Sequence, residues 1–370
     1  MNSIPIIDIS PLVHLDERSN DSENERLKSV VSQISSACET FGFFAVTNHG
    51  VDPQIIANAW DTSKDFFDLD PSIKGSVPMT SEYPYGYENH ESLGIERNNA
   101  AAATRMNPSS NLRPDSKETF SIGPLDNHKS GMPSRQWQKD APASFAPALS
   151  QYFSVMENLA RILFRGLALA LQLDDASWFL HEGRFDEGHQ CALRILNYPQ
   201  LQYEEEEERP KKVHIRAGAH TDYGAMTILK SGGPGLQLKL TSNKTDGEIS
   251  NDESSSWIDV PHLSDALIIN LGDLMQRWTN DRWRSTLHRV IAVPDDDGVV
   301  SVENTSNPRI FQSARRQSMA FFVNMNGNAN VVPFDSCIDE KHPCQYDSIK
   351  ASDHLMQRHA QSMGETTKEL

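Results

Sequence analysis

The second half of the chain is a succession of short apolar segments that are separated by turns and polar stretches. The segments that predict strands are residues 191–199, 226–229, 236–240, 257–260, 266–270, 286–292 and 317–323. They are not linked by helical patterns of about 10–15 residues, which a parallel α/β sheet would need. We therefore expect a mainly β region of the jelly-roll or barrel kind.

The first half carries helical patterns that would buttress this β region. Apolar residues recur at the helical period from Leu27 to Cys38 and again along residues 145–173. The segment 75–150 is largely irregular and includes a tyrosine cluster at 83–87. A loop of this length is unusual unless it covers something, so we expect part of it to form the mouth of a pocket.

Charge and cysteine content restrict the possible partners. The formal net charge is −17, whereas a nucleic-acid partner would call for clustered Lys and Arg. The four cysteines are scattered and form no Cys-x-x-Cys pair, which fits reduced thiols in the cytoplasm. No apolar run approaches the roughly 18 residues of a membrane helix. We expect a cytoplasmic monomer that binds neither nucleic acid nor membrane.

The strongest sign of chemistry lies in residues 217–229, where His220 and Asp222 precede an apolar run. If this stretch is a turn that enters a strand, both side chains project from one face, because alternate residues of a strand share a face. An imidazole and a carboxylate are two of the three ligands of a facial Fe(II) site, and His288 is a candidate third ligand. Taken alone, the pair could also be a metal-free surface feature and His288 a hydrogen-bonded core residue.

A second pair of polar residues follows in the last predicted strand. Arg316 and Ser318 are two positions apart, so their side chains would also share a face. An Arg fork binds a carboxylate through two hydrogen bonds, and a nearby hydroxyl adds one more. A guanidinium inside a barrel needs an anionic partner, which could be a ligand or a carboxylate of the protein itself.

The order of these motifs resembles the 2-oxoglutarate- and Fe(II)-dependent dioxygenases of the isopenicillin N synthase-like superfamily. The motifs are His220-x-Asp222, His288 and Arg316-x-Ser318, together with the segments 4–9, 42–51, 270–274 and 283–290. The resemblance covers most of the chain. It implies a distorted double-stranded β-helix, or jelly roll, buttressed by N-terminal helices, in an α+β or mainly β chain.

The resemblance also implies roles for individual residues. His220, Asp222 and His288 would bind Fe(II), and Arg316 and Ser318 would hold the distal carboxylate of 2-oxoglutarate. Tyr198, in the sequence Asn-Tyr-Pro, matches a family tyrosine that often touches the same cosubstrate. Two positions before it the family often has Asn, where this chain has Leu196. The spacing from His288 to Arg316 is also longer than usual, and Arg315 is a second candidate for the anchor.

The implied reaction couples the conversion of 2-oxoglutarate and O2 into succinate and CO2 to the oxidation of a C–H bond. The product would arise by hydroxylation, desaturation or oxidative cyclisation. We expect residues 1–130 to form the N-terminal region with loops at the substrate mouth. Residues 131–370 would form the catalytic region, and both would belong to one compact unit. Insertions at 241–256 and 294–313 have no assigned role.

The sequence is also compatible with three other functions. An isopenicillin N synthase-like oxidase would use no 2-oxoglutarate, and the Arg316-x-Ser318 motif does not exclude it. A metal-free β-helix could act as a binding module. A zinc hydrolase would use the same His and Asp ligands but would give Arg316 and Ser318 no role.

The surroundings of the substrate can be proposed from the sequence. Secondary metabolism is the expected setting, with a small molecule as substrate. We expect the pocket to be lined by a set of aromatic, apolar and amide side chains: Tyr85, Tyr87, Met226, Phe322 and Asn324. An Arg of the mouth region would pair with an acidic, amino-acid-like substrate, and the candidates are Arg97, Arg105 and Arg113.

Overall fold

The structure is a computed structural model of the 370-residue chain. It describes residues 3–15, 21–89, 117–125, 127–205, 214–240, 257–294, 299–300 and 309–362. Arg97, Arg105, Arg113 and the insertion 241–256 lie outside the described residues.

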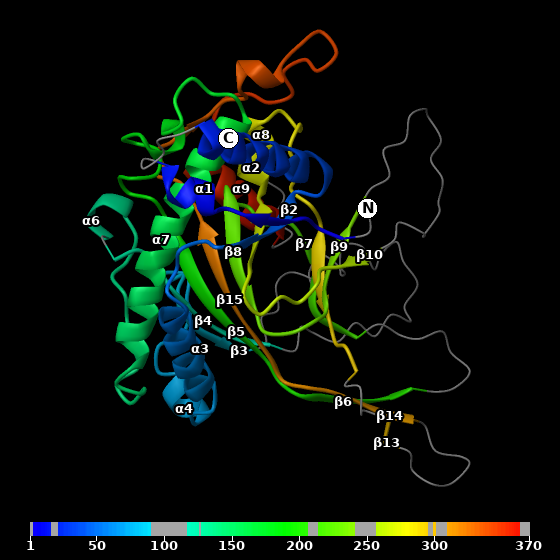
Figure 1. The fold of residues 1–370 in the computed structure, drawn as a ribbon. Coiled ribbons are helices and arrows are strands. Elements are labelled where there is room, and N and C mark those ends of the chain that lie inside the picture. The colour runs from blue at the N-terminus through cyan, green and yellow to red at the C-terminus, as the bar shows by residue number, and fades with distance from the viewer. Residues whose placement is uncertain are drawn as a thin grey trace, which may run out of the picture.

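An eight-stranded sheet forms the centre of the molecule (Figure 1). Its strands, in spatial order, are β1 (Ile6–Asp8), β2 (Phe43–Thr47), β11 (Leu267–Leu271), β8 (Met226–Ser231), β15 (Arg316–Val323), β5 (Ala192–Tyr198), β4 (Glu118–Ile122) and β3 (Gly86–Asn89). All neighbouring strands of this sheet are antiparallel except β1 and β2, which run parallel. Strands that are far apart in the sequence are therefore adjacent, as a jelly roll requires.

A smaller sheet forms the second wall of the jelly roll. Its strand order is β10 (Trp257–Asp259), β9 (Leu236–Lys239), β12 (His288–Ile291) and β7 (Ile215–His220). A separate three-stranded sheet projects from the body and consists of β13 (Val299–Val300), β14 (Arg309–Ser313) and β6 (Leu201–Glu205) (Figure 1). Part of the polar insertion predicted at 294–313 is thus a β arm. A final pair joins β16 (Asn330–Val331) to β17 (Ile349–Lys350).

Helices from the first half of the chain cover the outer face of the main sheet. The helices of the described residues are α1 (Ser10–Val13), α2 (Asp21–Thr40), α3 (Pro53–Phe67), α4 (Pro71–Lys74), α6 (Asn127–Ser130), α7 (Phe145–Ala170), α8 (Asp273–Trp278) and α9 (Ala351–Ser362), with 3-10 turns at Trp178–Leu180 and Asp335–Cys337. The helix predicted at 145–173 is α7, which packs on the sheet and buries one face along its whole length. The expected fold, a jelly roll with helical buttresses, is confirmed.

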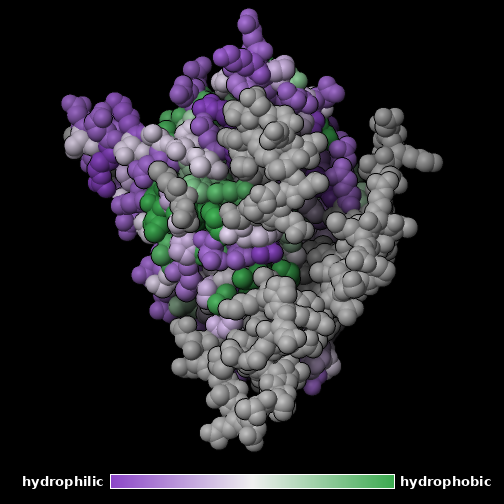
Figure 2. Space-filling view, turned by 90° about the vertical axis from the view of Figure 1, so that its right-hand side faces the viewer, coloured by the Kyte–Doolittle hydropathy of each residue, from purple (hydrophilic) through white to green (hydrophobic). Residues whose placement is uncertain are grey.

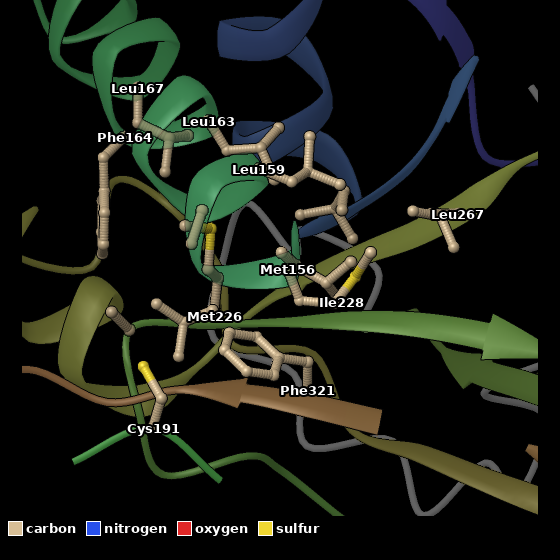
Figure 3. Close-up of a cluster of buried hydrophobic side chains, with 14 of the residues drawn as sticks. Met156, Leu159, Leu163, Phe164, Leu167, Cys191, Met226, Ile228, Leu267 and Phe321 are labelled. Atoms are coloured by element: carbon tan, nitrogen blue, oxygen red, sulfur yellow. The ribbon is translucent and has the colours of Figure 1, made fainter. Parts of the chain in front are cut away.

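The alternation of side chains along each strand separates two cores. On β15, Met319, Phe321 and Val323 belong to the larger core, which contacts α7. Figure 3 shows Phe321 within this core, with Met226 and Ile228 of β8 next to it. The intervening residues of β15 face the smaller sheet, where Ala320 joins a second cluster of buried residues. Every candidate cosubstrate residue on β15 lies on this inner face.

The surface of the described residues mixes polar and apolar side chains. Figure 2 shows hydrophilic and hydrophobic residues side by side on one face of the molecule. Large exposed hydrophobic residues among those described are Ile6, Leu125, Val332 and Met356. Single exposed apolar residues of this kind are ordinary on protein surfaces. Within the described ranges, no helix combines the length and the apolar character that crossing a bilayer demands.

Phe321 tests the packing between α7 and the sheet. Its ring is fully buried and lies edge-on to Phe153 of α7, with centroids 4.9 Å apart. Phe321→Ala should lower the free energy of unfolding by about 3–5 kcal/mol, because it leaves a cavity in a close-packed core. Urea unfolding measures this loss. Val332→Ala, at an exposed position, is the control and should stay within about 0.5 kcal/mol of the parent. Equal losses in both variants would contradict the assigned packing.

Candidate active site

Three side chains converge at one end of the space between the two sheets. One ligand atom each from His220, Asp222 and His288 lies within 4.8 Å of the other two. Asp222 Oδ1 is 3.8 Å from His220 Nε2 and 3.9 Å from His288 Nε2. The two imidazole ring centroids are 4.4 Å apart. Two imidazoles and a carboxylate at such spacing form the ligand set of a facial metal triad.

Strand pairing brings the two histidines together. His220 ends β7 and lies directly opposite His288, the first residue of β12, in the antiparallel ladder. Directly opposed residues have Cβ atoms only about 4.5–5.5 Å apart, so their side chains meet on the same face. His288 is buried and its ring packs edge-on against Phe43 of β2. The two histidines are distant along the chain, and only the ladder joins them.

The predicted geometry of the His-x-Asp motif was wrong in one respect. His220 and Asp222 do not share a strand, because β7 ends at His220 and Asp222 lies in the turn before β8. The turn is held by the start of α8: the Asp273 backbone N–H donates to the Asp222 carbonyl at 2.7 Å. A Cβ at Gly272 would come within 2.2 Å of the Gly224 carbonyl oxygen, so this close approach requires glycine.

Both imidazoles are oriented by backbone carbonyls. The Nδ1 of His220 lies 2.7 Å from the Gly218 carbonyl, and the Nδ1 of His288 lies 3.0 Å from the Thr286 carbonyl. A carbonyl can only accept, so Nδ1 carries the hydrogen in each ring. The lone pair is then on Nε2, the nitrogen that faces Asp222. This is the tautomer that a metal ligand needs, and the hydrogen bond fixes it.

Asp222 is oriented by two side chains on its far side. Its Oδ2 accepts hydrogen bonds from Thr227 Oγ1 at 2.5 Å and from Asn270 Nδ2 at 2.7 Å. Oδ1 is left to face the two imidazoles. Burial opposes ionisation of Asp222, but the imidazoles and these two hydrogen bonds together hold its pKa below the usual value.

The protonation states therefore suit a cation. Desolvation and the adjacent His288 lower the pKa of His220, which keeps its imidazole neutral at neutral pH. An ionised carboxylate and neutral imidazoles are the forms that bind a divalent metal. The donor set, the tautomers of both rings and the charge states of His220 and Asp222 thus fit Fe(II).

A buried arginine lies on the same inner face of the main sheet. Arg316 donates from Nη2 to Ser231 Oγ at 2.8 Å and from Nε to the Pro234 carbonyl at 3.2 Å. Its Cζ lies 5.3 Å from the ring centroid of Tyr198, its partner in the ladder. Among the described residues, no carboxylate lies within ion-pair distance of it. Burial lowers the pKa of Arg316, yet a guanidinium stays charged in proteins, so it calls for an anionic ligand.

Strand register sets Arg316 and the metal ligands in one space. In the β15–β8 ladder, Phe322 is opposite Thr227, and Ser318 is opposite Ser231. Thr227 is the hydrogen-bond partner of Asp222, and Ser231 is the partner of Arg316. The two neighbouring strands therefore carry the metal-facing end and the arginine end of a single column of side chains.

Arg315, the second candidate for the anchor, points elsewhere. Its guanidinium forms an ion pair with Asp68 and donates from Nε to Asn197 Oδ1 at 2.6 Å. Arg315 precedes β15, which begins at Arg316, and its contacts with Asp68 and Asn197 direct it away from the inner face. Arg316 is thus the arginine that faces the interior.

Two of the residues predicted to line the substrate pocket lie in the core that contacts the helices and not on the inner face of the sheet. Met226 and Tyr87 belong to the cluster that contacts the helices, where Met226 is buried beside Phe321 (Figure 3). The Tyr87 hydroxyl donates to Glu118 at 2.6 Å. Both were assigned to the pocket because the sequence does not show which face of each strand is turned inward.

The other predicted pocket residues are divided. Phe322 shares the inner face with Ser318, as expected from alternation on β15. Tyr85 packs in a small cluster with Val77 and Tyr83. The Asn324 side chain donates to the Gln190 carbonyl at 3.0 Å, a hydrogen bond that supports the chain after β15.

The residues that orient Asp222 were not predicted from the sequence. Asn270 is a buried polar residue in the otherwise apolar strand β11, and Thr227 alternates with the core residues Met226 and Ile228 on β8. A polar side chain in a buried strand needs a partner, and this was the available signal.

Comparison with known proteins decides the family. One family model, described as the N-terminal region of a non-haem dioxygenase in morphine synthesis, matches residues 4–144. A second, described as the 2OG-Fe(II) oxygenase superfamily, matches residues 190–325, which include every residue of the proposed metal and anion sites. The chain belongs to the 2OG-Fe(II) oxygenase superfamily.

Relatives of this oxygenase extend over nearly its whole length. Homoarginine-6-hydroxylase 2-ODD-233 of Oryza sativa subsp. japonica is 28% identical over 358 residues, 96% of this chain and 96% of its own. The 2-oxoglutarate-dependent dioxygenase tropC of Talaromyces stipitatus is 27% identical over 377 residues, 99% and 98% of the two chains. A full-length Neurospora crassa protein, crystallised with alpha-KG and thymine, matches at 25% identity with a TM-score of 0.73, covering 97% of each chain.

The oxygenase is therefore a 2-oxoglutarate-dependent dioxygenase, and its cofactor and cosubstrates are Fe(II), 2-oxoglutarate and O2. An oxidase without 2-oxoglutarate, a metal-free binding module and a zinc hydrolase are not favoured. The reason is that relatives are named for 2-oxoglutarate dependence and the Neurospora crassa protein was crystallised with that cosubstrate.

Thr227 tests the support of Asp222. Thr227→Val keeps the shape of the side chain and removes the hydrogen bond to Oδ2, so the metal affinity should fall about tenfold. Titration with Mn(II) under argon, followed by electron paramagnetic resonance, measures the dissociation constant. Thr119→Val is the matched control, because the buried Thr119 hydroxyl has no hydrogen-bond partner among the described residues. An unchanged affinity in Thr227→Val would contradict the assigned role.

Proposed function

We propose that the oxygenase uses His220, Asp222 and His288 to bind Fe(II), and Arg316, Ser318 and Tyr198 to bind 2-oxoglutarate, while it oxidises a C–H bond of a small molecule. The observation that carries this assignment is the placement of a metal-ligand triad and a buried arginine in one interior space. A dicarboxylate in that space would place one end at the metal and the other at the guanidinium.

When bound, the iron and 2-oxoglutarate supply the oxidising power: O2 and 2-oxoglutarate give succinate, CO2 and one oxygen atom for the substrate. The residues of the chain bind, orient and exclude water. Asp222 contributes the one negative charge of the ligand set, and the two hydrogen bonds to its Oδ2 keep Oδ1 turned inward. Arg316 holds the far carboxylate at a fixed position.

Apolar side chains line part of the space between these two ends. Leu196 and Ala320 lie on the inner face, buried in the second core cluster, and Leu229 packs against them. Leu196 stands where the resembling family often has Asn, so this chain offers an apolar contact to the near side of the cosubstrate. Apolar walls exclude water and strengthen the interaction between Arg316 and an anion.

The substrate class is inferred from the relatives and from the sequence. The relatives include a homoarginine hydroxylase, and the Neurospora crassa protein was crystallised with thymine, both small polar compounds. We propose a small-molecule substrate in secondary metabolism that is acidic and amino-acid-like. Hydroxylation, desaturation and cyclisation are all compatible with the arrangement. A cytoplasmic location and a monomeric state stay predictions.

We also propose one structural unit with an N-terminal region at residues 1–130 and a catalytic region at 131–370. The larger core supports this, because it contains Ile7 and Phe44 as well as Phe321. Residues from both regions thus share one set of buried contacts, which favours cooperative folding.

The coupling of O2 to 2-oxoglutarate tests the function. Anaerobically loaded enzyme should consume O2 only when 2-oxoglutarate is present, and succinate should form in a one-to-one ratio to the O2 consumed. An oxygen electrode and chromatographic analysis of succinate make the two measurements. Asp222→Ala should abolish both iron loading and succinate formation. Uptake of O2 without 2-oxoglutarate would show the oxidase reading to be correct.

The anchor for 2-oxoglutarate is tested by two neighbouring arginines. Arg316→Lys should raise the KM for 2-oxoglutarate roughly 10- to 100-fold, because the loss of a charge-assisted hydrogen bond costs about 1.5–3 kcal/mol. Arg315→Lys is the same substitution at the residue that precedes β15, where Arg315 contacts Asp68. Steady-state kinetics should show an unchanged KM for this control. A larger effect in Arg315→Lys would reverse the assignment.

A further inference from the structure

We propose that Arg194 binds an anionic group of the substrate, so that the oxygenase acts on small organic acids. This inference rests on the function proposed above and names the substrate class of the same site. It also replaces the expectation that an arginine of the mouth region, outside the described residues, makes this contact.

Arg194 lies on the inner face of the main sheet. On β5, Leu193 and Ile195 belong to the core that contacts the helices, so Arg194 projects from the other face. That face also carries Leu196 and Tyr198, which belong to the inner cluster. A half-buried cation thus faces the interior from the middle of the main sheet.

The two inner arginines occupy different positions. In the β15–β5 ladder, Arg316 is opposite Tyr198, whereas Arg194 is opposite Ala320. The two cations therefore stand at separate places along the same pair of strands. The carboxylate of 2-oxoglutarate that is remote from iron can meet only one of them, and Arg316 holds it in the proposed function. A second anion, on a different molecule, would meet Arg194.

The guanidinium of Arg194 is oriented by its neighbours. Its Nε donates to Ser121 Oγ of β4 at 3.0 Å, and its Cζ lies 5.8 Å from the ring centroid of Phe322. Phe322 is opposite Thr227 in the next ladder, and Thr227 holds Asp222. The arginine is thus directed toward the metal-facing end of the column. A guanidinium fixed by its neighbours binds a carboxylate with less loss of entropy than a mobile one.

Helix α9 contacts the turn that carries Asp222 and the start of α8. Arg358 of α9 forms an ion pair with Asp273 at 2.6 Å and donates to Thr221 Oγ1 at 3.1 Å. The ring of His359 lies edge-on to Tyr223, with centroids 5.2 Å apart. These contacts dock α9 on the turn that carries Asp222, between β7 and β8 in the sequence (Figure 1).

The docked helix brings the imidazole of His359 near Arg194. Burial and the charge of Arg194 lower the pKa of His359, which indicates that the two groups are close. The imidazole of His359 is therefore neutral at neutral pH, and the guanidinium of Arg194 is a cation beside Phe322. An anionic substrate would be attracted there despite the net charge of −17 of the whole chain. Phe322 would contact the apolar part of such a substrate.

The structural alternative is that Arg194 only ties β4 to β5 through Ser121 and packs on Phe322. That role needs the length and hydrogen bond of the side chain but no ligand. It predicts equal losses for acidic and neutral substrates when Arg194 is changed. The two roles therefore differ in the ratio of acid to amide turnover and not in activity alone.

The experiment uses the full chain loaded with Fe(II) and 2-oxoglutarate. A panel of aryl- and alkyl-carboxylic acids and the corresponding carboxamides is tested for stimulation of succinate formation. At least one acid should stimulate it more than its amide does. Arg194→Gln should raise the KM for that acid by about tenfold or more and leave the KM for 2-oxoglutarate unchanged. Arg194→Lys should recover part of the loss, because it retains the charge.

Two controls separate charge from folding. Arg282→Gln removes a surface ion pair with Glu39 and should change neither constant. His359→Asp should raise the KM for the acid, and His359→Arg should not, because only the first places a negative charge beside Arg194. The comparison of these two variants tests whether charge beside Arg194 controls acid binding, even if Arg194→Gln does not fold.

The proposal is overturned if no acid exceeds its amide, or if Arg194→Gln affects acids and amides equally. It is also overturned if His359→Asp and His359→Arg behave alike. Each of these results leaves substrate-independent conversion of 2-oxoglutarate intact. Absence of any 2-oxoglutarate conversion by the parent enzyme would instead overturn the proposed function.

Discussion

The site depends on one antiparallel pairing, in which His220 and His288 stand opposite each other on β7 and β12. This pairing fixes the distance between two imidazoles through the backbone, because the ladder sets the separation of opposed side chains. The turn after β7 then adds Asp222, held by the backbone N–H of Asp273 and by two side chains on its Oδ2. The pKa of His220 and that of Asp222 are both lowered, so the His220 ring is neutral beside an ionised carboxylate.

Side chains alternate between the two faces of each strand, so that one face packs in the core and the other carries the residues of the site. On β15, odd-numbered residues such as Phe321 bury against α7, while even-numbered residues such as Arg316 and Ser318 face the site. A shift of register by one residue would exchange these sides and lose the site together with the core. Stability and function are therefore specified by the same alternation. One face of β15 packs on the apolar helix α7, and the opposite face carries the polar residues of the site.

Much of the fold could be predicted from the sequence. The strands, the long helix now seen as Phe145–Ala170 and the order of motifs indicated a jelly roll with helical buttresses. The placement of Met226 and Tyr87 could not be predicted, because single-residue patterns do not say which face of a buried strand meets the helices. Arg194 and Thr227 were not predicted as site residues for the same reason, because their roles depend on residues that are close in space but distant along the chain.

The sequence by itself determined the inventory of the site: two imidazoles, one carboxylate, an arginine and a serine in a recognisable order. Local rules of alternation and composition are enough for that, because they act between residues close along the chain. Only the tertiary structure decided that Asp222 lies in a turn, that Arg316 and not Arg315 faces inward, and that α9 docks beside Arg194. Those outcomes follow from long-range strand pairing, whose partners no local pattern identifies.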